Sequence, residues 1–554
     1  MLARSLPERI PPEVLGRDQQ GSPELLAAPA GNGTVQMSAR ALMVLGTASH
    51  AGKSILTTAL CRILSNEGFR VAPFKAQNMS LNSAATPDGR EIGRAQALQA
   101  EACRIPPSAA MNPILIKPSC DRAAQIVVLG KVWGQMTAAD YHECRVEELF
   151  PTVVEAYQQL AAEYDVVVLE GAGSPAEINL KAHDIVNMRM AKAAGAACLL
   201  AADIDRGGVF ASLLGTVELL DAEERALLRG FIINKFRGDV SLLRPGVEMI
   251  AERVRIPCAG IVPWLPNLGL DEEDSVAMEE RRTASRAWAE RSNGPDRALR
   301  IGVIAFPYMA NFTDFDELSA EPSVALAFLE HPSDVRDADL LILPGSKQTL
   351  DDLAWLRRRG WEPEIHNFAG RAGVLGICGG MQMMGHGIED PEGVESHGSA
   401  RSAHGLGLLP ITTVLRHKKV TRPVQGRVAP SALFGARLEA PCFRGYEIHM
   451  GETVYTEGAQ PFAEIQRAGV AGSILDGAIA GHVRAYGTYV HGLFHEDVFR
   501  HSFLAAARSA CGLAPIESRA FVTAEREGRI DRLAEHVRQS LDMELIHECL
   551  GVRR

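Results

Sequence analysis

One cysteine stands where a reactive side chain would be expected. Cys378 lies between the apolar run 374–377 and the small residues Gly379 and Gly380, and a helix-like segment, 381–384, follows. This order is typical of a nucleophile elbow, a tight strand-to-helix turn at the carboxyl edge of a sheet. A helix N-terminus behind the sulfur favours the thiolate and offers backbone donors to an oxyanion. A buried structural cysteine is the alternative, but the flanking glycines and a downstream histidine favour a nucleophile.

That histidine is His491, which ends the short β-type run 488–490. A cysteine nucleophile needs a base that takes its proton and later protonates the leaving amine, so His491 is the predicted base. His449 ends a similar run and is predicted to line the substrate site or to be structural.

A second turn is predicted to lie beside the cysteine. The apolar strand 339–343 ends in a turn that contains Gly345 and Ser346, one βα unit before Cys378. Backbone N–H groups of this turn are candidates for the second half of an oxyanion hole, to which Gly379 also contributes. An ordinary βα turn is the alternative.

A separate stretch predicts a phosphate-binding loop. Gly46-Thr47 opens it and Gly52-Lys53-Ser54 closes it, with one residue more than the usual spacing, between the apolar strand 41–45 and an amphipathic helix, 55–64. Backbone N–H groups of such a loop surround a polyphosphate, and the lysine reaches its outer phosphates. Ser54 is the predicted Mg²⁺ ligand.

Three polar residues at later strand ends are expected at the same edge of the sheet, where ligands bind in open α/β folds. Lys75 follows the run 71–74, although a solvated surface lysine is equally compatible with it. Glu170 ends the run 164–169 and fits a carboxylate that holds or orients Mg²⁺, because a buried glutamate needs a metal or a basic partner. Asn234 opens the strand-end stretch 234–239 and is a candidate for reading a base or ribose, although the side chains of this stretch could equally be salt-bridged loop residues.

The positioning elements alternate between apolar strands and helix-like segments, which predicts an α/β protein with two doubly wound, mostly parallel sheets. The predicted domains are a leader at 1–38, a phosphate-loop domain at 39–275, a linker at 276–299, a second α/β domain at 300–500 and a helical tail at 501–554 without chemistry. Shorter β-type segments are expected after Cys378. The leader is predicted to be disordered, or to precede a start at Met37. Predicted strands are 41–45, 71–75, 164–170, 197–203, 230–234, 258–262, 300–306 and 339–343.

The composition and net charge are those of a globular protein that is not a general nucleic-acid binder. The chain has 554 residues, 46% hydrophobic and 23% charged, which is typical of a globular protein with more than one core. A formal net charge of -11 argues against a general nucleic-acid binder. The ten cysteines form no CxxC pair, which favours a reducing, cytoplasmic compartment, and no membrane segment is legible.

Taken together, the motifs resemble the cobyric acid synthase family from about Ala41 to the end of the chain. The matching stretches are 46–54, 74–83, 170–174, 376–382, 445–449 and 489–492. The resemblance implies a dethiobiotin-synthetase-like ATP domain followed by a class I glutamine amidotransferase domain of the cobyrinic-acid type.

The implied reaction amidates the b, d, e and g carboxylates of adenosylcobyrinic acid a,c-diamide, with one ATP and one glutamine for each amide. Cys378 and His491 would release ammonia from glutamine bound at Gly345, Ser346, Gly379 and Gln382. The resemblance also places Lys53 and Ser54 on ATP and Mg²⁺, and Glu170 on the metal. Gly46, Thr47, Gly52, Lys75 and Asn234 remain ATP-binding candidates from their positions at the sheet edge. The implied partners are small molecules only, and the oligomeric state is left open.

One position departs from the general amidotransferase pattern. A glutamate usually follows the histidine by two residues and orients its ring, but that position is Leu493. The cobyrinic-type branch shares this difference, so the third member of the site is unnamed. The related cobyrinic acid a,c-diamide synthase and a non-synthetase phosphate-loop ATPase switch are the alternatives.

Overall fold

The computed structural model describes residues 39–120, 123–137, 140–141, 146–266, 268–270, 294–396, 398–429, 432–480, 484–515 and 520–552. The predicted leader and most of the predicted linker lie outside these residues. The domain boundaries drawn from the sequence therefore stay predictions.

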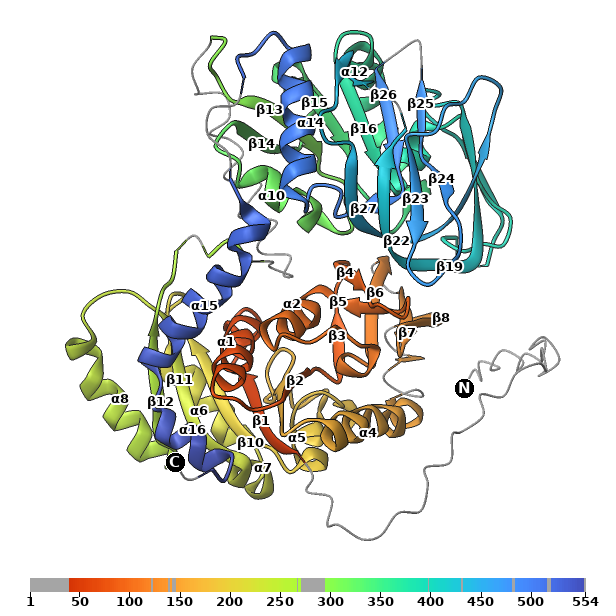
Figure 1. The fold of residues 1–554 in the computed structure, drawn as a ribbon. Helices are drawn as coiled ribbons and strands as arrows, with labels where there is room; N and C mark the ends of the chain where they lie inside the picture. Colours follow the sequence, from red (N-terminus) through yellow and green to blue (C-terminus); the bar gives the residue numbers. More distant parts are fainter. Residues whose placement is uncertain are drawn as a thin grey trace, which may run out of the picture. The chain divides into compact units, whose positions relative to one another are not determined.

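A six-stranded, all-parallel sheet in the order β12-β11-β10-β1-β9-β2 forms the centre of the first half (Figure 1). Its strands are apolar because both faces are covered. Leu42 and Val44 of β1 pack in one hydrophobic cluster, whereas Met43 and Leu45 pack in another on the opposite face. The strands are β1 (Arg40–Gly46), β2 (Val71–Phe74), β9 (Val166–Glu170), β10 (Ala197–Asp203), β11 (Leu228–Phe236) and β12 (Cys258–Pro263).

Helices cover both faces, as the predicted doubly wound fold requires. One cluster contains side chains of α1 together with α15 from the chain's end, and the other contains those of α4, α6 and α8. The helices of this half are α1 (Lys53–Asn66), α2 (Arg94–Ala102), α4 (Val146–Glu163), α5 (Met188–Ala194), α6 (Val209–Leu219), α7 (Ala222–Leu227) and α8 (Val240–Val254), with short 3₁₀ turns η2 (Ala109–Met111) and η4 (Lys181–His183).

Two small sheets lie between β2 and α4, where the sequence predicted none. Strands β3 (Gln77–Met79), β6 (Ile114–Cys120), β7 (Ala123–Val128) and β8 (Lys131–Thr137) form one, and β4 (Ser83–Ala85) pairs with β5 (Glu91–Gly93) in the other. The polar stretch after Lys75 therefore forms strand edges and turns.

A second six-stranded sheet has the order β14-β13-β15-β16-β26-β25, parallel except for β25. This arrangement confirms the predicted α/β class for both halves. Its strands are β13 (Leu299–Ile304), β14 (Val324–Leu329), β15 (Leu340–Leu343), β16 (Gly373–Ile377), β25 (Ala478–Ala480) and β26 (Ala485–Thr488). Its helices are η6 (Phe312–Phe315), α10 (Asp316–Ser319), η7 (Pro332–Asp337), α11 (Thr349–Arg358), α12 (Trp361–Ala369), α13 (Gly379–Met384) and α14 (Asp497–Ala510).

The shorter β segments expected after Cys378 are present, but they lie beside two long strands. Two long antiparallel strands, β19 (Ile411–Val428) and β22 (Cys442–Tyr455), dominate a further sheet, and a register shift between Leu415 and Val420 hides their length from a simple alternation pattern. The others there are β17 (Gly387–Asp390), β18 (Arg401–His404), β23 (Ala463–Arg467), β24 (Ile474–Asp476) and β27 (Val490–His491), while β20 (Ala432–Leu433) pairs with β21 (Ala436–Arg437).

The C-terminal helices α15 (Val522–Ser540) and α16 (Met543–Cys549) return to the first sheet, where α15 lies beside α1 and β12 (Figure 1). Ile530, Leu533 and Val537 of α15 are buried there. The tail therefore completes the core of the first half. Within the described residues, no helix combines the length and apolar character that a membrane span needs.

Candidate active sites

The phosphate-binding loop connects β1 to α1 as predicted. Thr47 fixes the start of the loop, because its backbone N–H donates to the oxygen of Ala201 on β10 at 2.9 Å. Lys53 Nζ donates to the backbone oxygens of Ala48 (2.9 Å) and Gly173 (3.1 Å), so the lysine folds back across the loop. A Cβ at Gly46 would lie 2.9 Å from Lys53 Nζ and 3.0 Å from the oxygen of Ala48, so a side chain there would displace the lysine.

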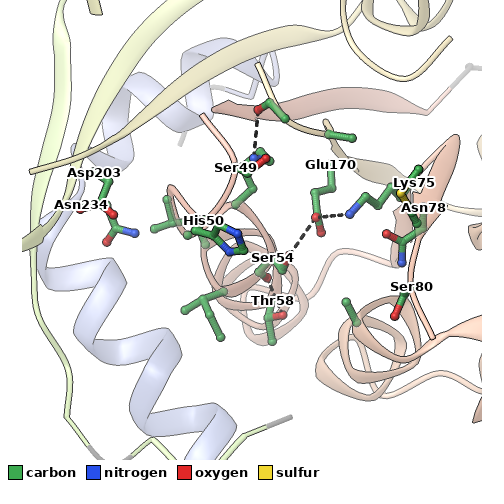
Figure 2. Close-up of a pocket in the computed structure, with 18 of the residues that line it drawn as sticks. Ser49, His50, Ser54, Thr58, Lys75, Asn78, Ser80, Glu170, Asp203 and Asn234 are labelled. Atoms are coloured by element: carbon green, nitrogen blue, oxygen red, sulfur yellow. Dashed lines mark hydrogen bonds and ion pairs between the residues drawn. The ribbon is translucent and has the colours of Figure 1, made fainter. Parts of the chain in front are cut away.

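Glu170 is the centre of the polar contacts behind the loop (Figure 2). It is 1% exposed, and its Oε1 accepts hydrogen bonds from Ser54 Oγ and Lys75 Nζ, both at 2.8 Å. Gln99 Nε2 donates to Oε2 at 2.5 Å. Burial disfavours ionisation of Glu170, but the charge and hydrogen bond of Lys75 and the bonds of Gln99 and Ser54 outweigh burial and lower its pKa. The sequence implied either a metal or a basic partner for a buried glutamate here, and Lys75 is a basic partner.

Ser54 and Glu170 fit a Mg²⁺ ion that keeps most of its water. A serine hydroxyl and a carboxylate oxygen 2.8 Å apart are the oxygen ligands this ion takes beside phosphates and water. Among the described residues, no group of three or more histidine, cysteine, aspartate or glutamate side chains could hold a metal. A site completed by phosphate oxygens does not need such a group.

Asn234 lies on the opposite side of the loop. Its Nδ2 donates to the oxygen of Ala51 at 2.9 Å, and a Cβ at Gly52, where φ is 90°, would lie 2.0 Å from this nitrogen. Asn234 thus packs directly against the loop. The neighbouring Lys235 pairs with Asp203 at 3.0 Å, so the sequence's salt-bridge alternative describes Lys235 rather than Asn234.

A cavity of about 1520 Å³ opens beside the loop, larger than the roughly 300–1,000 Å³ of most small-molecule sites. Lys53, Ser54, Lys75, Glu170 and Asn234 all line it. Its wall also includes side chains that the sequence did not associate with this site: Trp264, Leu265, Phe306, Met309, Phe312, Leu533, His536 and Val537. The last three come from α15, in the tail where the sequence indicated no chemistry. Their only sequence signal was helical spacing.

The second site is built around Cys378, in the predicted turn between β16 and α13. Its φ of 50° and ψ of -111° are strained for a residue with a side chain, which is typical of a nucleophile elbow. The backbone N–H donates to the oxygen of Thr488 on β26 at 2.8 Å. The thiol Sγ lies 3.7 Å from the oxygen of Ile448 on β22. The elbow thus holds the sulfur between two sheets.

The turn after β15 lies beside the elbow, as predicted. A Cβ at Gly379 would lie 2.9 Å from the backbone nitrogen of Ser346, and one at Gly345 would lie 2.9 Å from Cε1 of His491. The Ser346 hydroxyl is used locally, because it donates to Asp352 at 2.6 Å. The structure therefore brings Gly345, Ser346, Gly379 and His491 together, and backbone groups rather than the serine hydroxyl remain the candidate donors.

His491 is almost completely buried and has a partner that the sequence did not indicate. Its Nδ1 lies 2.7 Å from Asp314 Oδ2, and Asp314 Oδ1 accepts the backbone N–H of Gly492 at 2.9 Å. Burial lowers the pKa of His491, but the charge and hydrogen bond of Asp314 and the contact with the Cys378 thiol outweigh it and raise the pKa to about 10. Leu493, at the usual glutamate position, is 1% exposed in the core.

Gln382, Tyr489 and His449 form a polar group next to the elbow. Gln382 Nε2 donates to the Tyr489 hydroxyl at 3.4 Å, and the Tyr489 ring stacks on His449 with centroids 3.8 Å apart. His449 Nδ1 contacts the oxygen of Gly451 at 2.9 Å, and Glu447 pairs with Arg467. His449 Nε2 also lies 3.3 Å from Glu447 Oε1. Glu447 therefore contacts His449 and Arg467, whereas the carboxylate at the His491 ring is that of Asp314.

Polar contacts connect the two halves of the chain. Glu91 on β5, 1% exposed, accepts from Lys117 on β6 at 2.5 Å and also pairs with Lys419 on β19. Gln348 Nε2 donates to the oxygen of Ser119 at 2.7 Å. The buried negative charge of Glu91 is therefore paired with one lysine from each half.

Comparison with known proteins decides the family. Residues 42–276 match the CobQ/CobB/MinD/ParA nucleotide binding domain, and residues 300–499 match the CobB/CobQ-like glutamine amidotransferase domain. The cobyric acid synthase of Moorella thermoacetica is 46% identical over 517 residues, which is 93% of this chain and 98% of that protein. This chain belongs to the cobyric acid synthase family.

Other cobyric acid synthases are similar over the same extent. The protein of Sorangium cellulosum is 47% identical over 530 residues, covering 94% of this chain and 100% of its own. That of Photorhabdus laumondii is 46% identical over 519 residues, with coverage of 93% and 98%. The family therefore includes both the phosphate-loop half and the Cys378 half of this chain.

Proposed function

We propose that this chain is a glutamine-hydrolysing, ATP-dependent amide ligase that forms cobyric acid in cobalamin biosynthesis. The observation that carries the proposal is the presence, in one chain of this family, of a strained cysteine elbow and a phosphate-binding loop beside a large cavity. The cysteine site releases ammonia from glutamine, and the phosphate-loop site activates a carboxylate with ATP. A switch ATPase would leave the cysteine site without a role.

At the first site, the Cys378 thiolate attacks the side-chain amide carbon of glutamine. His491 holds the thiol's proton and transfers it to the departing nitrogen, so ammonia leaves and a thioester forms. Backbone donors around Gly345 and Gly379 stabilise the oxyanion. Water then cleaves the thioester to give glutamate and restore the thiol. Gln382 is proposed to contact the glutamine.

At the second site, a substrate carboxylate attacks the γ-phosphorus of ATP, which gives an acyl phosphate and ADP. Ammonia then attacks the acyl carbon, and phosphate leaves with the amide formed. Lys53 and the backbone of the loop bind the phosphates, with Thr47, Gly52, Lys75 and Asn234 completing the ATP-binding wall. Ser54 and Glu170 would hold a Mg²⁺ ion, which would supply positive charge to offset the phosphate oxygens.

The proposed acceptor is adenosylcobyrinic acid a,c-diamide, amidated at its b, d, e and g carboxylates. The cavity supports a corrinoid acceptor, because it is lined by apolar side chains such as Phe306, Met309 and Leu533 as well as by the phosphate-loop residues. A bulky, largely apolar ring carrying carboxylates fits such a wall. The alternative acceptor is cobyrinic acid, amidated at a and c.

Counting amides by mass spectrometry tests the proposal directly. With ATP, Mg²⁺ and glutamine, we expect the a,c-diamide to gain four amides. Cobyrinic acid itself should not replace it as the preferred acceptor. Amidation of cobyrinic acid without amidation of the a,c-diamide would assign the chain to the alternative reaction.

The Cys378→Ala variant tests the source of nitrogen. We expect glutamine-driven amidation to be lost, because no thiolate remains to open the amide, whereas ammonium-driven amidation is retained at the intact ATP site. Product formation with each nitrogen source measures this difference. Full glutamine-dependent activity in the variant would remove Cys378 from the mechanism.

A further inference from the structure

Asp314 has the contacts of a group that fixes an imidazole. It is 2% exposed, and its two oxygens are used by the ring of His491 and by the backbone N–H of Gly492. A carboxylate at Nδ1 selects the tautomer and orientation in which Nε2 serves the nucleophile. This contact performs, from another part of the chain, the task that Leu493 cannot perform.

The short segment that carries Asp314 has a special backbone. Asp314 lies in η6, whose first turn is closed by a hydrogen bond of 3.0 Å from its N–H to the oxygen of Asn311. Asn311 has a φ of 54°, a left-handed conformation that asparagine and glycine tolerate best. A shift at Asn311 therefore moves Asp314 directly.

Two hydrogen bonds from the phosphate-loop half hold this segment. The backbone N–H of Ser83 donates to Asn311 Oδ1 at 3.0 Å, and the backbone N–H of Phe312 donates to Asn82 Oδ1 at 3.0 Å. All four residues are buried. The position of Asp314 is thus set partly by residues 82–83, which end the polar stretch 77–83 after Lys75.

The same segment also forms part of the cavity wall. Met309 and Phe312 line the cavity from one side, and Ser80 and Asn82 line it as well. Both partners of the Asn82–Phe312 hydrogen bond therefore line the cavity. Phe312 and Asp314 lie in the same short helix η6, and Asp314 contacts the imidazole of His491 directly.

We propose that Asp314 is the positioning residue of His491, and that the segment 309–314, held by Asn82 and Ser83, ties glutamine hydrolysis to the state of the ATP-side cavity. The inference rests on the proposed glutaminase function. It adds to that function a residue for the third position and a physical route by which an occupied cavity favours release of ammonia.

Asp314→Asn tests the positioning role. Asparagine keeps the size but presents the wrong hydrogen-bonding group, so kcat for glutamine hydrolysis should fall about 100-fold or more, with KM for glutamine changed by less than about 3-fold. Ammonium-driven amidation should be unchanged. The alkaline limb of the pH profile of glutamine hydrolysis should move to lower pH. Asp314 helps to raise the pKa of His491 to about 10, so without its charge the imidazolium loses its proton at lower pH.

Glu317→Gln is the matched control, since Glu317 is a buried acid three residues further along that contacts His495 rather than His491. We expect its glutaminase kcat to stay within about 3-fold of the unaltered protein. Normal kcat and pH profile in Asp314→Asn, or an equal loss of ammonium-driven amidation, would overturn the positioning role. Absence of any glutaminase activity in the unaltered protein would instead contradict the proposed function.

Asn311→Gly tests the connection to the cavity. Glycine keeps the left-handed backbone but removes the acceptor for Ser83, whereas Asn311→Asp keeps an oxygen there. Glutaminase kcat should rise in the unaltered protein when ATP, Mg²⁺ and the a,c-diamide are present. That rise should be lost in Asn311→Gly, with kcat about 10-fold lower, and be kept in Asn311→Asp. No rise in the unaltered protein, or the same rise in Asn311→Gly, contradicts the connection.

Discussion

At the scale of single residues, each reactive group of this chain owes its state to a specific neighbour. Lys75 keeps the buried Glu170 ionised, and Asp314 raises the pKa of His491. The Cys378 backbone is held in a strained conformation between β16 and α13. Removal of one such residue should therefore affect one of the two reactions and leave the other intact.

Lys53→Ala should show this separation from the ATP side. The lysine donates to Ala48 and Gly173 across the loop and is the predicted phosphate ligand, so its loss should reduce amidation at least about 100-fold with either glutamine or ammonium. Basal hydrolysis of glutamine without ATP should continue, as glutamate release measures. Substantial ammonium-driven amidation in this variant would contradict the role of the loop.

At the scale of elements, the C-terminal helix α15 both completes a core and forms part of the site. Ile530 and Leu533 are both buried against the first sheet, yet only Leu533 belongs to the cavity wall. This difference makes the two residues a matched pair.

Leu533→Ala and Ile530→Ala should each lower the free energy of unfolding by about 3 kcal/mol, because each removes buried methyl groups and leaves a void. Chemical denaturation measures this loss. Only Leu533→Ala should also raise KM for ATP or the corrinoid, by about 5-fold, through loss of about 1 kcal/mol of contact. Equal KM changes in both variants would show that the helix affects the site only through stability.

At the scale of the whole molecule, two chemistries share one chain through a contact that contains buried charge. Glu91 faces Lys117 from its own half and Lys419 from the other. Burial opposes ionisation of Glu91, but the two lysines outweigh it and lower its pKa. A lysine in each half therefore has the buried Glu91 as its counter-charge.

Glu91→Gln should destabilise the protein by about 3 kcal/mol, because two buried ammonium groups lose their counter-charge. Fewer amides should form for each glutamine hydrolysed, since a loosened contact lets ammonia escape to solvent. Glu147→Gln, at an exposed pair with Arg189, is the control and should cost less than about 1 kcal/mol. An unchanged ratio of amide to glutamate in Glu91→Gln would show that this contact does not retain ammonia.

The amino-acid sequence by itself determined the α/β class, the phosphate loop, the cysteine elbow and His491, because each is a local pattern in which a strand and the turn after it are contiguous. Lys75 and Glu170 were placed at one sheet edge because parallel strands end together. Only the tertiary structure decided which groups meet across long separations. Asp314 lies 177 residues from His491, and α15 crosses back to the first sheet. Such contacts depend on how the elements pack, which no spacing along the chain records.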